Sequence, residues 1–222
     1  MEELFNQIAT CVEFGKINKT APYPPNMRDQ DGVDELTKLA LIQGASAQEI
    51  LSEALIKGMG KVGVKFRENK VFVPQVLMSA KAMAISMLHL KPYFASGEIK
   101  HKGTFIIGTV EGDLHDIGKN LVSMMVEGNG FKVIDLGTDV KAEMFIEAAS
   151  QNPGSILGLS ALLTTTMANM EKIVVQLKSS LPEMKICIGG APVNQSFCEQ
   201  IKADFYSRDP QGVVDYLNKI AG

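Results

Sequence analysis

The stretch Gly112-Asp113-Leu114-His115-Asp116-Ile117-Gly118 joins two segments of different hydrophobic period. Before it, residues 104–110 form an apolar run that is typical of a buried strand, and after it apolar residues recur at helical spacing. The seven residues therefore form a loop between a strand and a helix. Because ligands of open α/β sheets bind outside the carboxyl ends of the strands, we expect this loop to border a ligand site.

Two side chains of this loop have the chemistry of a metal site. The imidazole of His115 can reach a ligand, and the carboxylate of Asp113 can accept a hydrogen bond from the other ring nitrogen. Such a bond fixes the tautomer and the basicity of a metal-binding imidazole. Taken alone, His115 could equally be a satisfied loop or core histidine, and Asp116 could simply favour the start of the following helix.

From about Thr104 onwards, strand patterns alternate with helical patterns. This alternation favours a parallel sheet with helices on both faces, as in Rossmann-like domains. We expect five strands in a flavodoxin-like order, with the switch point beside the first strand. The expected strands are residues 104–110, 132–135, 155–160, 185–188 and 203–206, and the expected helices are residues 116–128, 141–149, 166–180, 194–200 and 211–220.

The first part of the chain shows helical periodicity instead. We expect helices over residues 1–17, from residue 31 or 33 to 43, from the capping box Ser46–Glu49 to Phe66, and from Val73-Pro74 onwards. Pro92 and residues 95–98 should end the last helix and form a linker. The sequence therefore predicts an α/β protein with a four-helix bundle at residues 1–97 and a Rossmann-like domain at residues 98–222.

Composition restricts the class of function. The 222 residues carry a net charge of −3 and no basic stripe, so nucleic acid is not an expected partner. The N-terminus does not resemble a signal peptide, and no stretch approaches the roughly 18 uninterrupted apolar residues of a membrane span. Cys11, Cys187 and Cys198 form no Cys-x-x-Cys pair, which argues against a zinc site and favours the reducing cytoplasm.

Two further motifs follow the loop. After Gly118 come 41 residues and then Ser160-Ala161-Leu162, and 26 residues later comes Gly189-Gly190. Asp-x-His-x-x-Gly, Ser-x-Leu and Gly-Gly in this order resemble the cobalamin-binding signature. The chain is similar, from about Val33 to its end, to the corrinoid proteins of methyltransferase systems and to the corresponding module of cobalamin-dependent methionine synthase.

The resemblance implies a cobalamin cofactor that is bound base-off, with its dimethylbenzimidazole tail displaced from the cobalt and inserted into the protein. His115 is then the lower axial cobalt ligand, and Asp113 holds the other ring nitrogen. The relay of the family ends at a hydroxyl after the third strand, where Thr166 stands in this chain and the methionine-synthase pattern has serine.

The same resemblance implies a narrow channel for the tail. Gly118, Gly189 and Gly190 are expected to line it, because glycine lets the backbone approach closely. Ser160 should hydrogen-bond the tail and Leu162 should pack on its face. The remaining cofactor contacts implied by the resemblance are Gly112, Leu114, Asp116, Ile117 and Thr164.

The helical part resembles the cap that covers the upper face of the corrin. Two apolar side chains, seven residues apart, shield the cobalt in that family, and they correspond to Phe66 and Val73. Such a lid excludes water and oxidants and moves to admit a partner. Both residues could also be ordinary core residues of the bundle.

Together these features imply a methyl carrier rather than a complete enzyme. A substrate-specific methyltransferase would load the methyl group to give methylcobalamin, an acceptor methyltransferase would remove it, and a reductive activator protein would restore the reduced cobalt. Methanol, methylamines, betaine and methoxylated aromatics all remain open as donors, and the proline-rich segment from Tyr23 to Met27 favours the aryl-ether or betaine type. The alternatives are a cobalamin-binding sensor or regulator and the small subunit of an adenosylcobalamin mutase.

Overall fold

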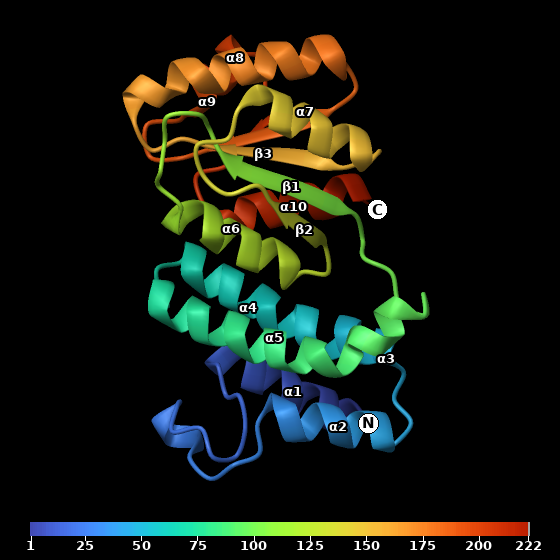
Figure 1. The fold of residues 1–222 in the computed structure, drawn as a ribbon. Coiled ribbons are helices and arrows are strands. Elements are labelled where there is room, and N and C mark those ends of the chain that lie inside the picture. The colour runs from blue at the N-terminus through green and yellow to red at the C-terminus, as the bar shows by residue number, and fades with distance from the viewer. Residues whose placement is uncertain (222) are drawn as a thin grey trace. The chain divides into compact units, whose positions relative to one another are not determined.

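The computed structural model describes residues 1–221 (Figure 1). The chain divides into two compact units. The first, the helical unit, consists of Met1–His101 with Gly128–Gly130, and the second, the sheet unit, consists of Lys102–Glu127 with Phe131–Gly222.

The helical unit contains the amphipathic helices that the sequence predicts. Its elements are α1 (Glu2–Phe14), the short 3-10 turn η1 (Pro25–Met27), α2 (Val33–Ile42), α3 (Ala47–Glu49), the π-helical segment η2 (Ile50–Leu55), α4 (Ile56–Arg67) and α5 (Val73–Ala95). The capping box forms as predicted, since Ser46 Oγ accepts the Glu49 N–H at 3.2 Å and Glu49 Oε2 accepts the Ser46 N–H at 2.9 Å. Ile8, Val12, Ile50, Leu55 and Met59 lie in one buried cluster that forms the core.

Two helix ends differ from the prediction. Helix α1 ends at Phe14 rather than at residue 17, because Gly15 adopts a left-handed conformation with φ of 72°. Helix α5 continues past Pro92 to Ala95. A proline has no N–H to bond the carbonyl four residues earlier, that of Leu88, so the helix continues with one backbone hydrogen bond fewer.

Helix α5 is also the one described helix that is long and apolar enough to cross a membrane, with a mean hydropathy of 1.2 over an 18-residue window. Length and composition alone are weak evidence, because core helices of soluble proteins meet the same criteria. Helix α5 packs against α1, α2 and α4, and its apolar side is part of the bundle core.

The sheet unit is a five-stranded parallel sheet with the order β2-β1-β3-β4-β5, as predicted. Its strands are β1 (Thr104–Thr109), β2 (Lys132–Asp135), β3 (Ile156–Ser160), β4 (Lys185–Gly189) and β5 (Phe205–Tyr206). Its helices are α6 (Ile117–Glu127), α7 (Ala142–Gln151), α8 (Thr164–Ser180), α9 (Gln195–Gln200) and α10 (Pro210–Ala221). The chain reverses direction across the sheet beside β1, so the loop after β1 lies at the switch point.

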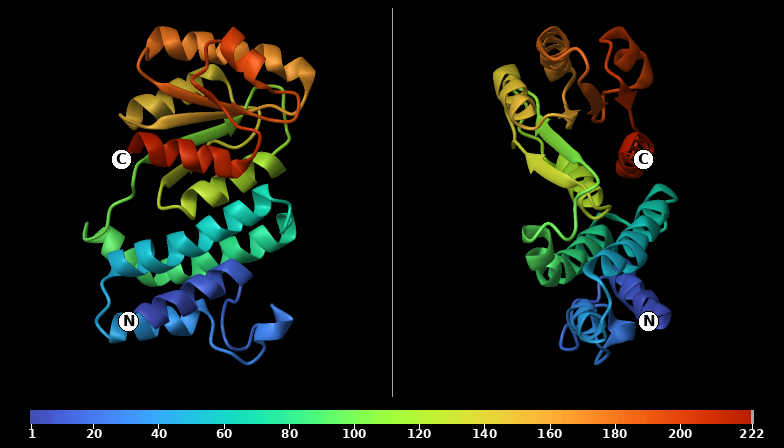
Figure 2. Two further views of the ribbon diagram at one scale, coloured as in Figure 1. Left: turned by 180° about the vertical axis from the view of Figure 1, so that it is seen from behind. Right: turned by 90° about the vertical axis from the view of Figure 1, so that its right-hand side faces the viewer.

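The two faces of the sheet are covered by different helices (Figure 2). Ile106, Leu157 and Ile186 point to one face and share a buried cluster with Phe145 of α7 and Val174 of α8. Alternate residues point to the other face, where α6 packs against α10. We call this second side the α6/α10 face.

Candidate functional site

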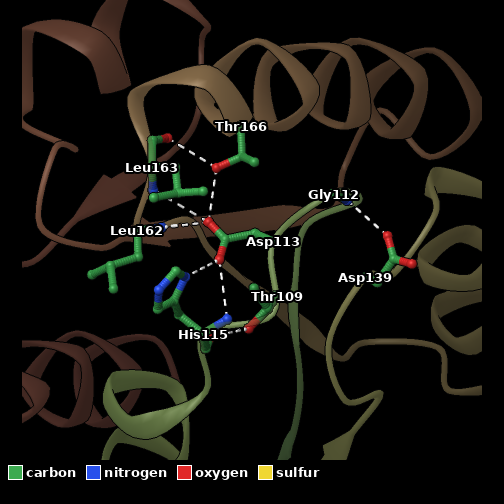
Figure 3. A network of polar contacts seen from close by, with 8 residues as sticks. All are labelled: Thr109, Gly112, Asp113, His115, Asp139, Leu162, Leu163 and Thr166. Carbon is green, nitrogen blue, oxygen red and sulfur yellow. Dashed lines mark hydrogen bonds and ion pairs between the residues drawn. The ribbon is translucent and has the colours of Figure 1, made fainter.

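The loop after β1 folds around the carboxylate of Asp113 (Figure 3). Asp113 Oδ1 accepts the backbone N–H of His115 at 3.1 Å, and the same oxygen lies 2.7 Å from His115 Nδ1. The first contact is an Asx-turn, in which an aspartate accepts the N–H two residues later. The Asp-x-His spacing therefore produces both contacts locally, and the ring is turned back towards the carboxylate that precedes it.

The other oxygen of Asp113 is held by the segment after β3. Asp113 Oδ2 accepts the N–H groups of Leu162 at 2.7 Å and of Leu163 at 3.3 Å, and Thr166 Oγ1 lies 2.8 Å from it. Burial alone would raise the pKa of Asp113, but the hydrogen bonds from Leu162, His115 and Thr166 outweigh burial and hold the pKa well below its usual value. Asp113 is therefore a buried carboxylate that accepts hydrogen bonds on both oxygens.

The ionised state of Asp113 fixes the tautomer of His115. A carboxylate can only accept, so the ring donates through Nδ1, and Nε2 keeps its lone pair. The side chain of His115 is 50% exposed, and Nε2 points away from Asp113 (Figure 3). This geometry makes Nε2 a basic nitrogen at the protein surface, which is suited to bind a metal ion.

Two residues that were not predicted also position this loop. Thr109, fully buried at the end of β1, donates its hydroxyl to the carbonyl oxygen of His115 at 2.9 Å. Asp139, from the loop after β2, accepts the Gly112 N–H at 2.7 Å and donates its own N–H to the carbonyl of Asp113 at 3.0 Å. Its positive φ of 56° marks Asp139 as a special backbone position, which no local pattern indicates. The loop is thus held from β1, from β3 and from the loop after β2.

Large apolar side chains are exposed on the two segments that meet at Asp113. We call Leu114, Ile117, Leu162 and Leu163 the apolar rim; they are exposed by 73%, 74%, 42% and 41%. An exposed apolar group of this kind marks a binding surface. A flat, largely apolar ligand could cover the rim while the ring nitrogen reaches its centre.

A row of small residues runs across the carboxyl edge of the sheet behind this rim. Thr109 pairs with Ser160 and Ser160 pairs with Gly189, so the three residues point to the same face. It is the α6/α10 face, because Thr109 stands three residues after Ile106, which points to the opposite face, and side chains alternate along a strand. The row ends at Gly189, which has no side chain to fill the space beside it.

The glycines predicted to line the channel fall into two groups. A Cβ at Gly118 would meet no atom within 4 Å, and a Cβ at Gly189 would meet only the Ser207 carbonyl oxygen at 3.9 Å. Both positions thus border open space. Gly190 has φ of 129°, and a Cβ there would lie 1.8 Å from the Ala161 carbonyl oxygen, so the fold itself requires this glycine.

The remaining predicted residues lie apart from the carboxylate network. Thr164 is exposed at the first position of α8, and Asp116 accepts a hydrogen bond from the Asn120 side chain at 3.0 Å. Phe66 and Val73 belong to the helical unit, where both are half-buried, on α4 and at the start of α5. Their predicted role as a cap stays a prediction.

The donor set suits a metal that is already held by a macrocycle. Within residues 1–221, no group of three or more histidine, cysteine, aspartate or glutamate side chains could hold a metal ion. A bare zinc ion takes about four ligands, whereas a metal ion that a macrocycle already holds needs fewer ligands from the protein. His115 Nε2 offers one such nitrogen, and the apolar rim lies beside it.

Comparison with known proteins identifies the family. The B12 binding domain family matches residues 103–213, and a second B12 binding domain family matches residues 27–91. A corrinoid protein of Desulfitobacterium hafniense is 39% identical over 199 residues, which cover 87% of this chain and 92% of the relative. Trimethylamine corrinoid protein 1 of Methanosarcina acetivorans is 38% identical over 196 residues, which cover 86% of this chain and 91% of the relative.

A solved structure agrees with these relatives. The methanol:cobalamin methyltransferase complex of Methanosarcina barkeri contains a chain with a TM-score of 0.82 and 31% identity, and the match covers 99% of this chain and 80% of that one. The family matches include the whole Asp113–His115 loop and both later motifs. This chain therefore belongs to the B12-binding corrinoid proteins of methyltransferase systems, and its cofactor is a corrinoid.

Proposed function

We propose that this protein carries a methyl group on cobalamin that is bound base-off, with His115 as the lower axial ligand of the cobalt. The observation that supports this most is the His115–Asp113 contact of 2.7 Å at Nδ1, which leaves Nε2 basic and half-exposed. When bound, cobalamin supplies the cobalt centre that accepts and releases the methyl group. Everything else in the site serves to hold and orient that cofactor.

The residues of the site have separate tasks in this proposal. Asp113 keeps a proton on His115 Nδ1, and Thr166 donates to Asp113 or to the Leu163 carbonyl, which its oxygen approaches to 2.9 Å. The single hydroxyl proton can therefore move between two acceptors while Asp113 keeps its backbone donors. The apolar rim seats the corrin, and Ser160 with Gly118 and Gly189 accommodates the tail.

The helical unit would supply the cap in this proposal. Phe66 and Val73 are apolar and half-buried, so each can cover a ligand without losing its place in the bundle. We assign the cap to a domain of residues 1–97 and the cofactor site to residues 98–222, although the compact units of the structure divide between His101 and Lys102.

The partners in this proposal are a substrate-specific methyltransferase, an acceptor methyltransferase and a reductive activator. The trimethylamine corrinoid relative and the methanol:cobalamin methyltransferase complex support a small methylated amine or alcohol as the methyl donor. We further propose a cytoplasmic location, which the three buried free thiols support.

Electron paramagnetic resonance of the protein loaded with Co(II) cobalamin tests the axial ligand. Protein labelled with ¹⁵N-histidine should show a two-line nitrogen splitting from His115, in place of the three-line splitting of the ¹⁴N protein. His115→Ala should lose this signal, whereas His101→Ala should keep it. A three-line splitting in the labelled wild-type protein, as the cofactor's own ¹⁴N base would give, would overturn the proposal.

A further inference from the structure

One buried polar atom at the carboxyl edge of the sheet unit has no hydrogen-bond partner within residues 1–221. Gln211 is the second residue of α10 and is 6% exposed. Its Nε2 donates to Asp215 Oδ1 at 2.9 Å, which fixes the orientation of the amide, and its Oε1 is buried without a hydrogen-bond donor among the described residues. An unpaired buried acceptor costs about 1–3 kcal/mol, so such an atom needs an explanation.

The position of Gln211 on α10 indicates where its side chain lies. Asn218, seven residues later on the same stripe of the helix, accepts a hydrogen bond from Lys102 Nζ at 2.9 Å. Lys102 precedes β1, so this stripe faces β1 and α6, and α10 indeed packs against α6. Seven residues of helix span about 10 Å. Since α10 begins beside the carboxyl edge and runs back along the sheet, Gln211 lies on that stripe near the carboxyl edge.

The small-residue row ends on the same face. Thr109, Ser160 and Gly189 point to the α6/α10 face at the carboxyl edge, and Gly189 borders open space. The start of α10 is close to this row, because the carbonyl of Ser207, three residues before α10, is the nearest atom to a Cβ at Gly189. Gln211 is therefore placed across the space that the row leaves open.

We propose that Gln211 Oε1 accepts a hydrogen bond from the nucleotide tail of the bound corrinoid. The inference rests on the proposed base-off binding, because only a detached tail reaches the space between the sheet and α10. An amide oxygen cannot donate, so it would repel the tail phosphate and select a hydroxyl of the ribose, a group that cobinamide lacks. The start of α10 then forms the wall of the tail site opposite the small-residue row.

Two corrinoids and two substitutions test this assignment. Gln211→Met keeps the unbranched shape but removes the acceptor. Gln195→Met is the matched control, because Gln195 also donates to an acidic residue four positions later, at 2.9 Å, but on the exposed helix α9. The measurements are the melting temperature of the cofactor-free chain and the dissociation constants for cobalamin and for cobinamide, which lacks the nucleotide tail.

We expect Gln211→Met to melt at or above the wild-type temperature, because no buried acceptor is then left unpaired. Its affinity for cobalamin should fall about 3- to 10-fold, with unchanged affinity for cobinamide. Gln195→Met should change neither affinity. An unchanged ratio of the two affinities in Gln211→Met would overturn the assignment while base-off binding stands. If the wild-type protein instead keeps the benzimidazole on cobalt, the proposed function fails first and this assignment fails with it.

Discussion

Replacing Asp113 with asparagine should move the proton of His115 from Nδ1 to Nε2. In the wild-type protein, Oδ2 accepts from the Leu162 N–H at 2.7 Å, and a backbone N–H can only donate. The asparagine must therefore place its oxygen at that position and its NH₂ group where Oδ1 was, 2.7 Å from Nδ1. The NH₂ group donates, so Nδ1 must accept and Nε2 must carry the proton. The nitrogen that faces the cofactor then lacks a free lone pair.

The magnitude follows from the kind of contact that is lost. Removing a carboxylate that orients a metal-binding imidazole costs about 10–100-fold in affinity, or about 1.4–2.7 kcal/mol. In the wild-type protein the backbone N–H of His115 lies 3.1 Å from Oδ1. In the variant this N–H would face the NH₂ group, and the conflict between two donors adds to the loss of affinity. We therefore expect cobalamin affinity to fall towards the upper end of this range, as measured by visible titration.

Nitrogen NMR of the cofactor-free protein reports the tautomer directly, because the chain contains only three histidines. The control is Asp113→Ala, which removes the acceptor without supplying a donor and should give a mixture of tautomers. If Asp113→Asn keeps the proton on Nδ1 and binds cobalamin with wild-type affinity, the reasoning from the carboxylate geometry is refuted.

The same variant tests the charge of Asp113 through pH. Burial would raise the pKa of this carboxyl, but its hydrogen bonds hold the folded-state pKa well below 3.8. A carboxyl whose pKa is lowered by folding stabilises the protein above its unfolded-state pKa and loses that contribution as the pH falls. The wild-type advantage over Asp113→Asn in unfolding free energy should be full near pH 7 and shrink below about pH 4. If urea denaturation gave the same difference in unfolding free energy between the two proteins at pH 7 and below pH 4, the proposed contribution of the Asp113 charge would be contradicted.

Three further substitutions or treatments give distinct outcomes. Thr109→Val removes the hydroxyl that holds the His115 carbonyl and should cost about 0.5–1.5 kcal/mol in urea unfolding, while Thr109→Ser should restore most of it; equal stability of both variants would exclude that bond. Gly189→Ala should fold normally and bind cobalamin more weakly, whereas Gly190→Ala should lose about 1–3 kcal/mol of stability or more from backbone strain. A Gly189→Ala protein that melts at a lower temperature than Gly190→Ala would refute the geometry of these two positions. Burial raises the pKa of Cys11 to about 11, so iodoacetamide at pH 8 should label it only after unfolding; rapid labelling of the native protein, detected by mass spectrometry, would contradict its burial.

The fold of the sheet unit could be predicted because its signals are local and repeated. Alternating strand and helix patterns indicate a parallel sheet, and the strand order follows from right-handed crossovers around a switch point. Element ends were less predictable. The sequence predicts that Pro92 ends α5, yet the helix continues to Ala95, because tertiary packing can outweigh the loss of one backbone hydrogen bond.

In the site, too, contacts between neighbouring residues were predictable and contacts between distant parts of the chain were not. Asp113 and His115 are only two residues apart in the sequence. Their hydrogen bond belongs to a local Asx-turn, so the Asp-x-His spacing is enough to predict it. The contacts of Thr109 and Asp139 depend on strand register and on a loop 27 residues away from Gly112. Gln211 shows its significance only through a missing partner, which no sequence pattern can display. Tertiary contacts of this kind need coordinates.

Several donors converge on Asp113, which in turn holds the His115 ring before any cofactor binds. Immobilising one side chain costs about 0.5–1.5 kcal/mol, and here the His115 ring is already fixed by folding, so binding does not have to supply that energy. Thr109→Val, which loosens the loop but leaves the tautomer intact, can therefore weaken cobalamin binding by at most about tenfold. Asp113→Asn must weaken it more, because it changes both the order and the proton. The ranking of these two variants thus separates positioning of the ring from its basicity.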